Sequence, residues 1–319
     1  MTKVSLILPT KNVEDNIEDL LSSVYHQDFS GEIETIILDS SNDKTPEIAK
    51  RFLVEFIRVE EDNYNYGGTR NYGAQVASGK YLIFLSADVV IKDPQWLTNL
   101  LTPFKDPMVA GVFGRQHPKK DATPMEEFFI QHFYPTKNYI RETDDRGNIQ
   151  LTDLMFFSNT NSAIRKDIWE EIKLPEMLMS EDHEWAKRVV LSGYKIAYTS
   201  ESVVYHSHNY TLKQVFRRFF DTGATLSYVY RHKRIEYPKA IFIIKGLKYL
   251  KAECQYLVKH GKVKHLPYAM LYEFIRFLGY FLGTNQKYMP LWLKTMLCNK
   301  KNHWKKYNDI IVDNDIIVD

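Results

Sequence analysis

The feature that most constrains the fold is an alternation of short apolar runs and helix-like segments over the first hundred residues. Strand-like runs occupy Val4–Leu8, Glu34–Leu38, Phe56–Val59 and Tyr81–Leu85. Helical patterns separate them at Glu14–Tyr25, Thr45–Phe52 and Tyr72–Ala77. Strands and helices that alternate in this way are typical of βαβ units. The sequence therefore predicts an α/β fold with a mixed, mostly parallel sheet flanked by helices.

The rest of the chain is more helical. We expect helices at Asp93–Leu101, Asp182–Leu191 and Leu212–Phe220, short strands at Lys195–Thr199 and Val203–Tyr205, and a loop-rich stretch over 115–150. After about residue 230 the pattern becomes helical and amphipathic, around Ile241–Leu257 and Tyr268–Leu282. This second part predicts a helical extension of the α/β unit.

Charge is distributed unevenly along the chain. The net charge is only +2, but residues 231–306 hold 17 Lys and Arg against 3 Asp and Glu. The last thirteen residues carry four Asp and no Lys or Arg, and residues 1–230 are net acidic. We therefore predict three parts: an α/β domain over 1–230, a basic amphipathic helical region over 231–306, and an acidic tail over 307–319. The tail holds a tandem Asn-Asp-Ile-Ile-Val-Asp repeat, to which we assign no function.

A basic, aromatic-rich segment favours an anionic partner. No recognised nucleic-acid motif accompanies it, so we expect a membrane surface and no nucleic acid. The alternative is a solvated helical subdomain that closes a binding site or mediates oligomerisation. We expect neither a signal peptide nor a membrane-spanning helix, and Cys254 and Cys298 suggest no disulfide framework. The expected location is cytoplasmic, peripheral at the inner face of the cell membrane.

Polar residues follow the predicted strands, at the sheet edge where parallel α/β folds bind ligands. Asp88 ends the very apolar strand Tyr81–Leu85, and Asp39 ends the neighbouring one. Carboxylates in these positions can hold a hard divalent cation or accept a hydrogen bond from a base or ribose. The alternative for both is an ordinary turn or helix-cap role.

Two further clusters combine glycine, arginine and carboxylates. The segment Gly67-Gly68-Thr69-Arg70-Asn71 fits neither a dinucleotide fingerprint nor a P-loop. Its glycines permit close approach of a ligand, and Arg70 could pair with a phosphate or with an acidic group. The adjacent pair Glu181-Asp182 begins a predicted helix, where it could supply a general base or complement the helix dipole.

Histidines and basic residues complete the set of candidates. His206 and His208 follow a predicted strand, and side chains two apart in an extended segment point to opposite faces. We therefore expect at most one of the two to be a ligand. Gln214, Arg217 and Arg218 share a side of the next predicted helix, which is otherwise an ordinary solvated basic face.

The order of these elements is more specific than any one of them. After the opening Ser-Leu-Ile-Leu-Pro-Thr-Lys-Asn, 49 residues separate Asp39 from Asp88, and Asp182 lies 94 residues further on. A His and a Gln-x-x-Arg segment follow. Over roughly residues 3–225 the chain resembles family 2 glycosyltransferases, which have the Rossmann-like, nucleotide-sugar-binding GT-A fold. Gly67–Asn71, His206–Gly223 and Tyr280–Gly283 most resemble bacterial rhamnosyltransferases of cell-surface polysaccharide synthesis.

The resemblance implies a role for each matching residue. Asp182 matches the proposed catalytic base, and Asp88 matches the last acid of the family's Asp-x-Asp motif. Asp88 would coordinate Mg²⁺ or Mn²⁺, together with His206 or His208. The implied nucleotide-binding residues are Pro9, Thr10, Asn12, Asp39, Ser41, Gly67 and Arg70, and the implied acceptor or diphosphate residues are Glu181, Gln214 and Arg217. The implied partners are a dTDP- or UDP-linked sugar donor and a saccharide or lipid-linked acceptor.

Two departures from the family pattern bear on function. The acidic motif reads Ser86-Ala87-Asp88, so a serine replaces its first aspartate, and Arg218-Phe219 stands where processive synthases have tryptophan. We therefore expect an inverting, metal-dependent glycosyltransferase of the hexosyltransferase class that moves one sugar, rhamnose or a hexose, in bacterial polysaccharide synthesis. The alternative is a catalytically inactive nucleotide-sugar-binding or membrane-associated scaffold protein.

Overall fold

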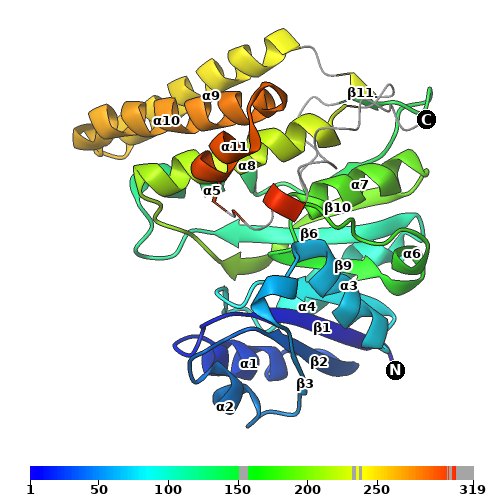
Figure 1. Cartoon of the computed structure of the whole chain (residues 1–319). Helices are drawn as coiled ribbons and strands as arrows, with labels where there is room; N and C mark the ends of the chain where they lie inside the picture. The colour runs from blue at the N-terminus through cyan, green and yellow to red at the C-terminus, as the bar shows by residue number, and fades with distance from the viewer. Residues whose placement is uncertain (151–156, 232–234, 237–238, 300, 302–303, 307–319) are drawn as a thin grey trace.

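The computed structural model describes residues 1–150, 157–231, 235–236, 239–299, 301 and 304–306, so the tandem repeat lies outside the described residues. A nine-stranded sheet forms the centre, in the order β3-β2-β1-β4-β9-β6-β10-β5, with β7 also paired to β10 (Figure 1). Its strands are β1 (Lys3–Thr10), β2 (Glu32–Asp39), β3 (Glu55–Arg58), β4 (Tyr81–Leu85), β5 (Val90–Ile91), β6 (Val109–His117), β7 (Tyr139–Arg141), β9 (Asn161–Arg165) and β10 (Lys195–Tyr205). A small parallel pair joins β8 (Ile149–Gln150) to β11 (Ile235–Glu236).

The direction of the strands brings several of their ends to one edge. Strands β1, β2, β3 and β4 are parallel, and so are β6 and β10. Strand β9 is antiparallel to both β4 and β6, so those two run the same way. The carboxyl ends of β1, β2, β4, β6 and β10 therefore share one edge of the sheet, which confirms the predicted mixed, mostly parallel α/β architecture.

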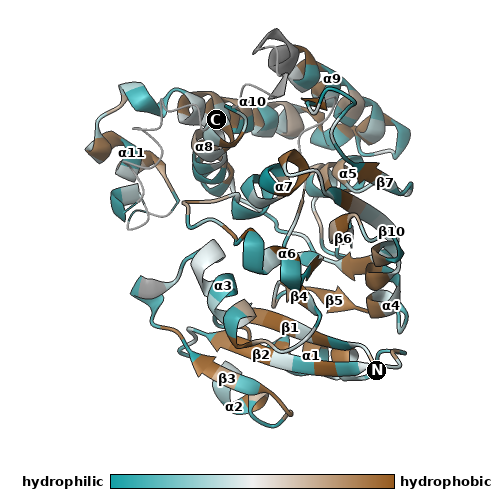
Figure 2. Ribbon diagram, turned by 90° about the vertical axis from the view of Figure 1, so that its right-hand side faces the viewer, coloured by the Kyte–Doolittle hydropathy of each residue, from teal (hydrophilic) through white to brown (hydrophobic). Residues whose placement is uncertain are grey.

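Helices cover both faces of the sheet. They are α1 (Ile17–Tyr25), α2 (Thr45–Ala49), α3 (Tyr66–Val76), α4 (Trp96–Leu101), α5 (Pro124–Phe133), α6 (Lys166–Glu171), α7 (Glu181–Leu191), α8 (Leu212–Val229), α9 (Lys239–Lys259), α10 (Leu266–Thr284) and α11 (Leu291–Leu297). One core layer joins α1, α2 and α4 to the sheet around Trp96, and a second joins α3, α5, α6 and α7 around Trp185. In the ribbon coloured by hydropathy, the central strands are the most apolar part (Figure 2).

The secondary structure departs from the expectations at three places. Gly67 and Gly68 lie inside α3 rather than before it, because the Asn65 side chain caps the helix by accepting from the Gly68 N–H at 2.8 Å. The loop-rich stretch 115–150 also contains α5, a helix that was not predicted. The two short strands predicted at 195–205 are one strand, whose register against β6 shifts between Thr199 and Val203.

The helical extension is present and packs closely on α8. Helix α10 crosses α8 at glycines: a Cβ on Gly283 would lie 2.1 Å from the Phe220 carbonyl oxygen, and one on Gly279 would lie 2.5 Å from that of Phe216. The two backbones therefore touch without intervening side chains. Among the described residues, no helix combines the length and the apolar character needed to cross a membrane.

This contact predicts opposite effects for two glycine-to-alanine changes. Gly283→Ala should lower the free energy of unfolding by about 1–3 kcal/mol, because its methyl group meets backbone that cannot easily move. Gly246→Ala is the matched control on α9, where a Cβ meets nothing within 4 Å. It should raise stability by up to about 1 kcal/mol, as alanine favours the helix. Denaturant titration measures both, and equal effects of the two changes would argue against the close contact.

Candidate active site

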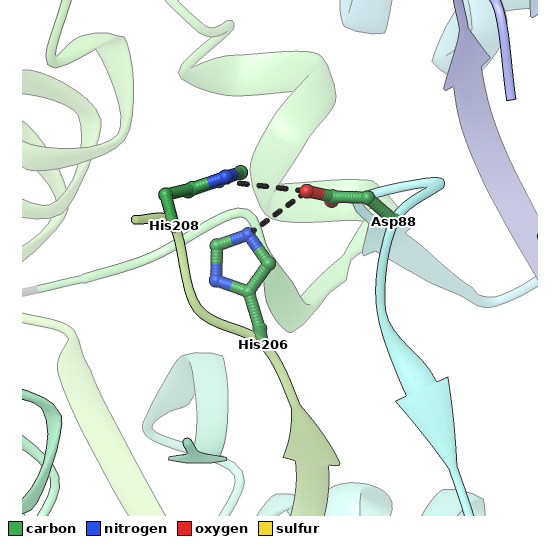
Figure 3. Close-up of side chains that lie close together, drawn as sticks. All are labelled: Asp88, His206 and His208. Atoms are coloured by element: carbon green, nitrogen blue, oxygen red, sulfur yellow. Dashed lines mark ion pairs between the residues drawn. The ribbon is translucent and has the colours of Figure 1, made fainter. Parts of the chain in front are cut away.

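Three side chains from two strand ends converge at the carboxyl edge of the sheet. Asp88 lies in the turn after β4, and His206 and His208 follow the end of β10. The Asp88 Oδ2 lies 3.4 Å from Nε2 of each histidine (Figure 3). One ligand atom from each residue lies within 4.8 Å of the other two. A carboxylate oxygen and two imidazole nitrogens at this spacing can share one metal ion.

The two histidines do not point to opposite faces, since both approach Asp88, so the geometric reason for expecting at most one ligand was wrong. Strand β10 ends at Tyr205, so both histidines lie beyond the strand. The imidazole rings are therefore neighbours, with centroids 4.5 Å apart and planes nearly perpendicular. The alternation of side chains holds only within a strand.

The surroundings of Asp88 and His208 favour the unprotonated form of each side chain. Burial raises the pKa of the Asp88 carboxyl, but the hydrogen bond and charge of His206 outweigh it and hold that pKa well below its usual range. Burial, followed by the charge of His206, lowers the pKa of His208 to about 4. At neutral pH, Asp88 is therefore a carboxylate and His208 has a free lone pair on one nitrogen.

Gln116, at the end of β6, fixes the orientation of His206. Both hydrogens of its side-chain amide are donated, one to the Tyr134 hydroxyl and one to Ser158 Oγ at 3.1 Å. Its Oε1 is left to accept from His206 Nδ1 at 2.8 Å. With its proton on Nδ1, a neutral His206 would offer the Nε2 lone pair to a metal ion shared with Asp88.

Glu126 supports the other histidine through the backbone. It lies in α5, it is buried, and its Oε1 accepts from the His208 N–H at 3.2 Å. Burial raises the pKa of its carboxyl. Sequence reasoning missed both Gln116 and Glu126, and the only local signal at Glu126 was its place three residues after the helix-capping Thr123.

Five of the seven predicted nucleotide-binding residues lie at the ends of β1 and β2, and the other two, Gly67 and Arg70, lie in α3. Asp39 is fully buried and accepts from Thr10 Oγ1 at 2.8 Å, from Ser41 Oγ at 2.6 Å and from Arg58 Nη1 at 2.6 Å. Asn12 has a left-handed backbone with φ 52°, and its side-chain oxygen accepts from the Asn42 N–H. Pro9 lies one residue inside the end of β1. The carboxylate of Asp39 therefore accepts its hydrogen bonds from protein groups in this structure. One of these donors, Arg58, was not singled out from the sequence.

The second acidic group lies at the start of α7. Asp182 Oδ2 accepts from the Asn159 N–H at 3.3 Å, and its other oxygen accepts from the His183 N–H at 2.9 Å. Burial raises the pKa of Asp182 and, together with the charge of Asp182, that of Glu181. The preceding residue, Ser180, has a left-handed φ of 63°, a conformation that costs energy for a residue with a side chain.

Arg70 forms an ion pair with Glu181 instead of being exposed to a phosphate. Its Nη1 lies 3.0 Å from Glu181 Oε1, and both side chains are buried. Gly67 allows a close approach of protein rather than of a ligand, because a Cβ there would lie 2.1 Å from the Pro175 carbonyl oxygen. The helix that carries Arg70 is in this way fixed against the segment that leads into Asp182.

On α8, the arginine that faces the site is Arg218. It is exposed, stacks over Tyr210 at 5.4 Å, and its charge acts on Glu126, Asp182 and His208. Gln214 instead closes the capping box of α8 with Thr211. Arg217 lines an apolar groove of about 370 Å³ with Leu212, Lys213, Phe216, Ile275, Met296 and Leu297. Gln214 and Arg217 were predicted to lie near the diphosphate or the acceptor, whereas the charge of Arg218 acts on both His208 and Asp182.

Comparison of the sequence with known proteins identifies the family. Residues 5–173 match the family described as Glycosyl transferase family 2. An O-antigen chain rhamnosyltransferase of Salmonella typhimurium is 32% identical over 95% of this chain and 96% of its own length, and one from Salmonella anatum is 32% identical with the same coverage.

Solved structures agree on the fold. A mannosyltransferase from Pyrobaculum calidifontis, in complex with GDP-Man and Mn²⁺, superimposes with a TM-score of 0.59 at 18% identity, covering 89% of this chain and 86% of that one. S. aureus TarS 1–349 in complex with UDP-GlcNAc gives a TM-score of 0.52 at 16% identity, covering 89% and 91%. The protein is therefore a glycosyltransferase with the GT-A fold. More narrowly, the chain belongs to glycosyl transferase family 2, and its relatives include O-antigen rhamnosyltransferases.

Proposed function

We propose that the protein transfers a single sugar from a nucleoside diphosphate donor to a saccharide or lipid-linked acceptor in bacterial cell-surface polysaccharide synthesis. Rhamnose carried on dTDP is the first candidate donor, and a UDP-linked hexose is the second. The observation that carries the proposal is the placement of Asp88, His206 and His208 at the strand ends. The identity to two rhamnosyltransferases over nearly the whole chain supports the choice of sugar.

The residues at this edge fit a divalent cation. Asp88 would supply a carboxylate oxygen, and His206 and His208 would supply one imidazole nitrogen each. Of the two candidate ions, Mn²⁺ accepts nitrogen ligands more readily than Mg²⁺, which strongly prefers oxygen. When bound, such an ion offsets the negative charge that grows on a departing diphosphate. We also propose that the guanidinium of Arg218, whose charge acts on His208 and Asp182, would bind the same diphosphate.

We propose Asp182 as the general base of an inverting displacement. Its carboxylate would take the proton of the acceptor hydroxyl as that oxygen attacks the anomeric carbon and the diphosphate leaves from the opposite side. Glu181 holds Arg70 beside it and would position the acceptor. Gln214 and Arg217 are proposed acceptor or diphosphate contacts. Pro9, Thr10, Asn12, Asp39, Ser41, Gly67 and Arg70 would form or support the nucleotide pocket.

The direct test is a transfer assay on the full chain. It would compare dTDP-rhamnose with UDP-glucose as donors in the presence of Mn²⁺, and NMR of the product would give the configuration of the new bond. We expect preferential use of dTDP-rhamnose and inversion at the anomeric carbon. Transfer from UDP-glucose alone would contradict dTDP-rhamnose as the donor. Retention of configuration would contradict Asp182 as the general base of an inverting displacement.

Two substitutions of Gln116 test whether this residue positions His206 for metal binding. Gln116→Leu should weaken Mn²⁺ binding by about 10–100-fold, because His206 loses the acceptor that fixes its orientation. Gln116→Glu keeps an acceptor at Nδ1 and should retain most of that affinity. Calorimetric Mn²⁺ titration of the free enzyme measures both. Equal affinities in the two variants would mean that Gln116 does not position His206.

We also place the protein at the inner face of the cell membrane. The surplus of cations in residues 231–306 supports attraction to an anionic surface. Such a position would bring the site to a lipid-linked acceptor. We propose that the catalytic domain ends near residue 230, just after α8, whose last residue is Val229.

A further inference from the structure

The two sides of α10 differ in a way that points to a second surface of the protein. The inner side carries Gly279 and Gly283, which pack against α8. On the outer side, Met270, Phe274, Phe277 and Phe281 recur at spacings of four, three and four, so they lie in one row along the helix. Their exposed fractions are 57%, 60%, 41% and 51%. We call this row the α10 stripe.

The outer side of α10 is entirely uncharged. Every exposed residue of the helix is Pro, Tyr, Met, Leu or Phe. Its two charged residues, Glu273 and Arg276, turn inward and pair with each other at 3.0 Å, and Arg276 also donates to Tyr249 of α9. A solvated helix of a soluble protein carries polar residues on its outer face. A contiguous apolar row with none therefore indicates a contact surface.

The positive charge around the α10 stripe favours an anionic partner. Helix α9 lies along α10 (Figure 1) and exposes Lys248, Lys251 and Lys259. Lys264 and Lys287, just before and after α10, are exposed as well. The segment 231–306 as a whole holds 17 cations against 3 anions. A second copy of this chain would bring the same positive charge to the contact and be repelled, whereas an anionic surface would be attracted.

We propose that the α10 stripe docks on an anionic lipid bilayer, with α10 lying parallel to the surface. Its phenyl rings would enter the boundary between head groups and acyl chains, and the neighbouring lysines would bind lipid phosphates. The helix would lie on the membrane without crossing it, which fits the absence of any described helix able to span one. This rests on the peripheral position proposed above and adds the surface that makes the contact.

The test is flotation of the full chain with two kinds of vesicle, phosphatidylcholine alone and an equal mixture with phosphatidylglycerol. The protein should float with the anionic vesicles at low salt. The triple change Phe274→Gln, Phe277→Gln and Phe281→Gln should weaken this binding at least about tenfold. Leu53→Gln, Met108→Gln and Ile140→Gln is the matched control, since these side chains are also exposed and apolar but lie outside the extension. The control should bind as the unchanged protein does.

Several outcomes would overturn the proposal: no flotation of the unchanged protein, equal flotation with neutral vesicles, or equal binding by the stripe variant. A dimer in light scattering that the stripe variant abolishes would assign the stripe to a second copy of the chain. The change affects exposed positions, so the melting temperature should stay within a few degrees of the unchanged protein. Release of nucleoside diphosphate with a water-soluble acceptor should also be unchanged, which separates a failure of docking from a failure of the proposed activity.

Discussion

Changing Asp182 to Asn is expected to reduce kcat by about 10²–10⁴-fold, the usual contribution of a general base. Asparagine has nearly the same size and keeps one oxygen that can accept the backbone hydrogen bonds of Asn159 or His183. The fold and the affinity for donor should therefore change little, while proton removal from the acceptor is lost. Steady-state rates at saturating donor measure the effect. Activity above about a tenth of the original would rule out Asp182 as the base.

The pH profile gives an independent check on Asp182. A general base works only when it is deprotonated, and burial raises the pKa of this carboxyl above its ordinary range. The rate should therefore fall on the acid side at a pH higher than an exposed aspartate would give, and the remaining activity of Asp182→Asn should lack that fall. Asp19→Asn, on the exposed side of α1, is a suitable control that should leave both rate and profile unchanged.

The second large effect is expected at the metal cluster. Asp88→Asn removes the only carboxylate of the three proposed ligands and should weaken Mn²⁺ binding by more than about 100-fold, since losing a residue that merely orients a ligand costs about 10–100-fold. Transfer should be lost in parallel, because the charge on the leaving diphosphate is no longer offset. Mn²⁺ titration by calorimetry measures the affinity, and the transfer assay measures the rate.

Single changes of the two histidines show whether both belong to the site. Both Nε2 atoms lie 3.4 Å from the same carboxylate oxygen. We therefore expect His206→Ala and His208→Ala each to reduce Mn²⁺ affinity. Unchanged affinity in Asp88→Asn would contradict the metal site as a whole, and a loss in only one histidine variant would reduce the site to two ligands.

The fold and the strand ends could be predicted from sequence because they depend on local patterns. The apolar run Tyr81–Leu85 is a strand in the structure with the same bounds, and Asp88 lies just beyond it. Parallel strands bring their carboxyl ends together, so Asp39 and Asp88 could be assigned to one edge without coordinates. The histidine pair was misjudged because its geometry depends on where β10 ends, which the spacing of two residues does not reveal.

The supporting residues could not be predicted, because each acts across a long separation in sequence. Gln116 reaches His206 over 90 residues and Glu126 reaches His208 over 82. Arg58 binds Asp39 through the pairing of β2 with β3. The choice between Arg217 and Arg218 could not be made although the predicted helix start at Leu212 was correct, because it depends on tertiary neighbours: Arg217 lines the apolar groove and Arg218 stacks over Tyr210.

The measurement that tests the central claim most directly is the thermal stability of the protein with dTDP, UDP, GDP or ADP, each with Mn²⁺ and with a chelator. A nucleotide at about 100 times its Kd adds about 2.7 kcal/mol to stability, which raises Tm by a few degrees. We expect dTDP, or failing that UDP, to stabilise the protein only with Mn²⁺, and the shift to vanish in Asp88→Asn. Equal shifts with Mn²⁺ and with chelator, or an undiminished shift in Asp88→Asn, would contradict a nucleotide-sugar site built on Asp88, His206 and His208.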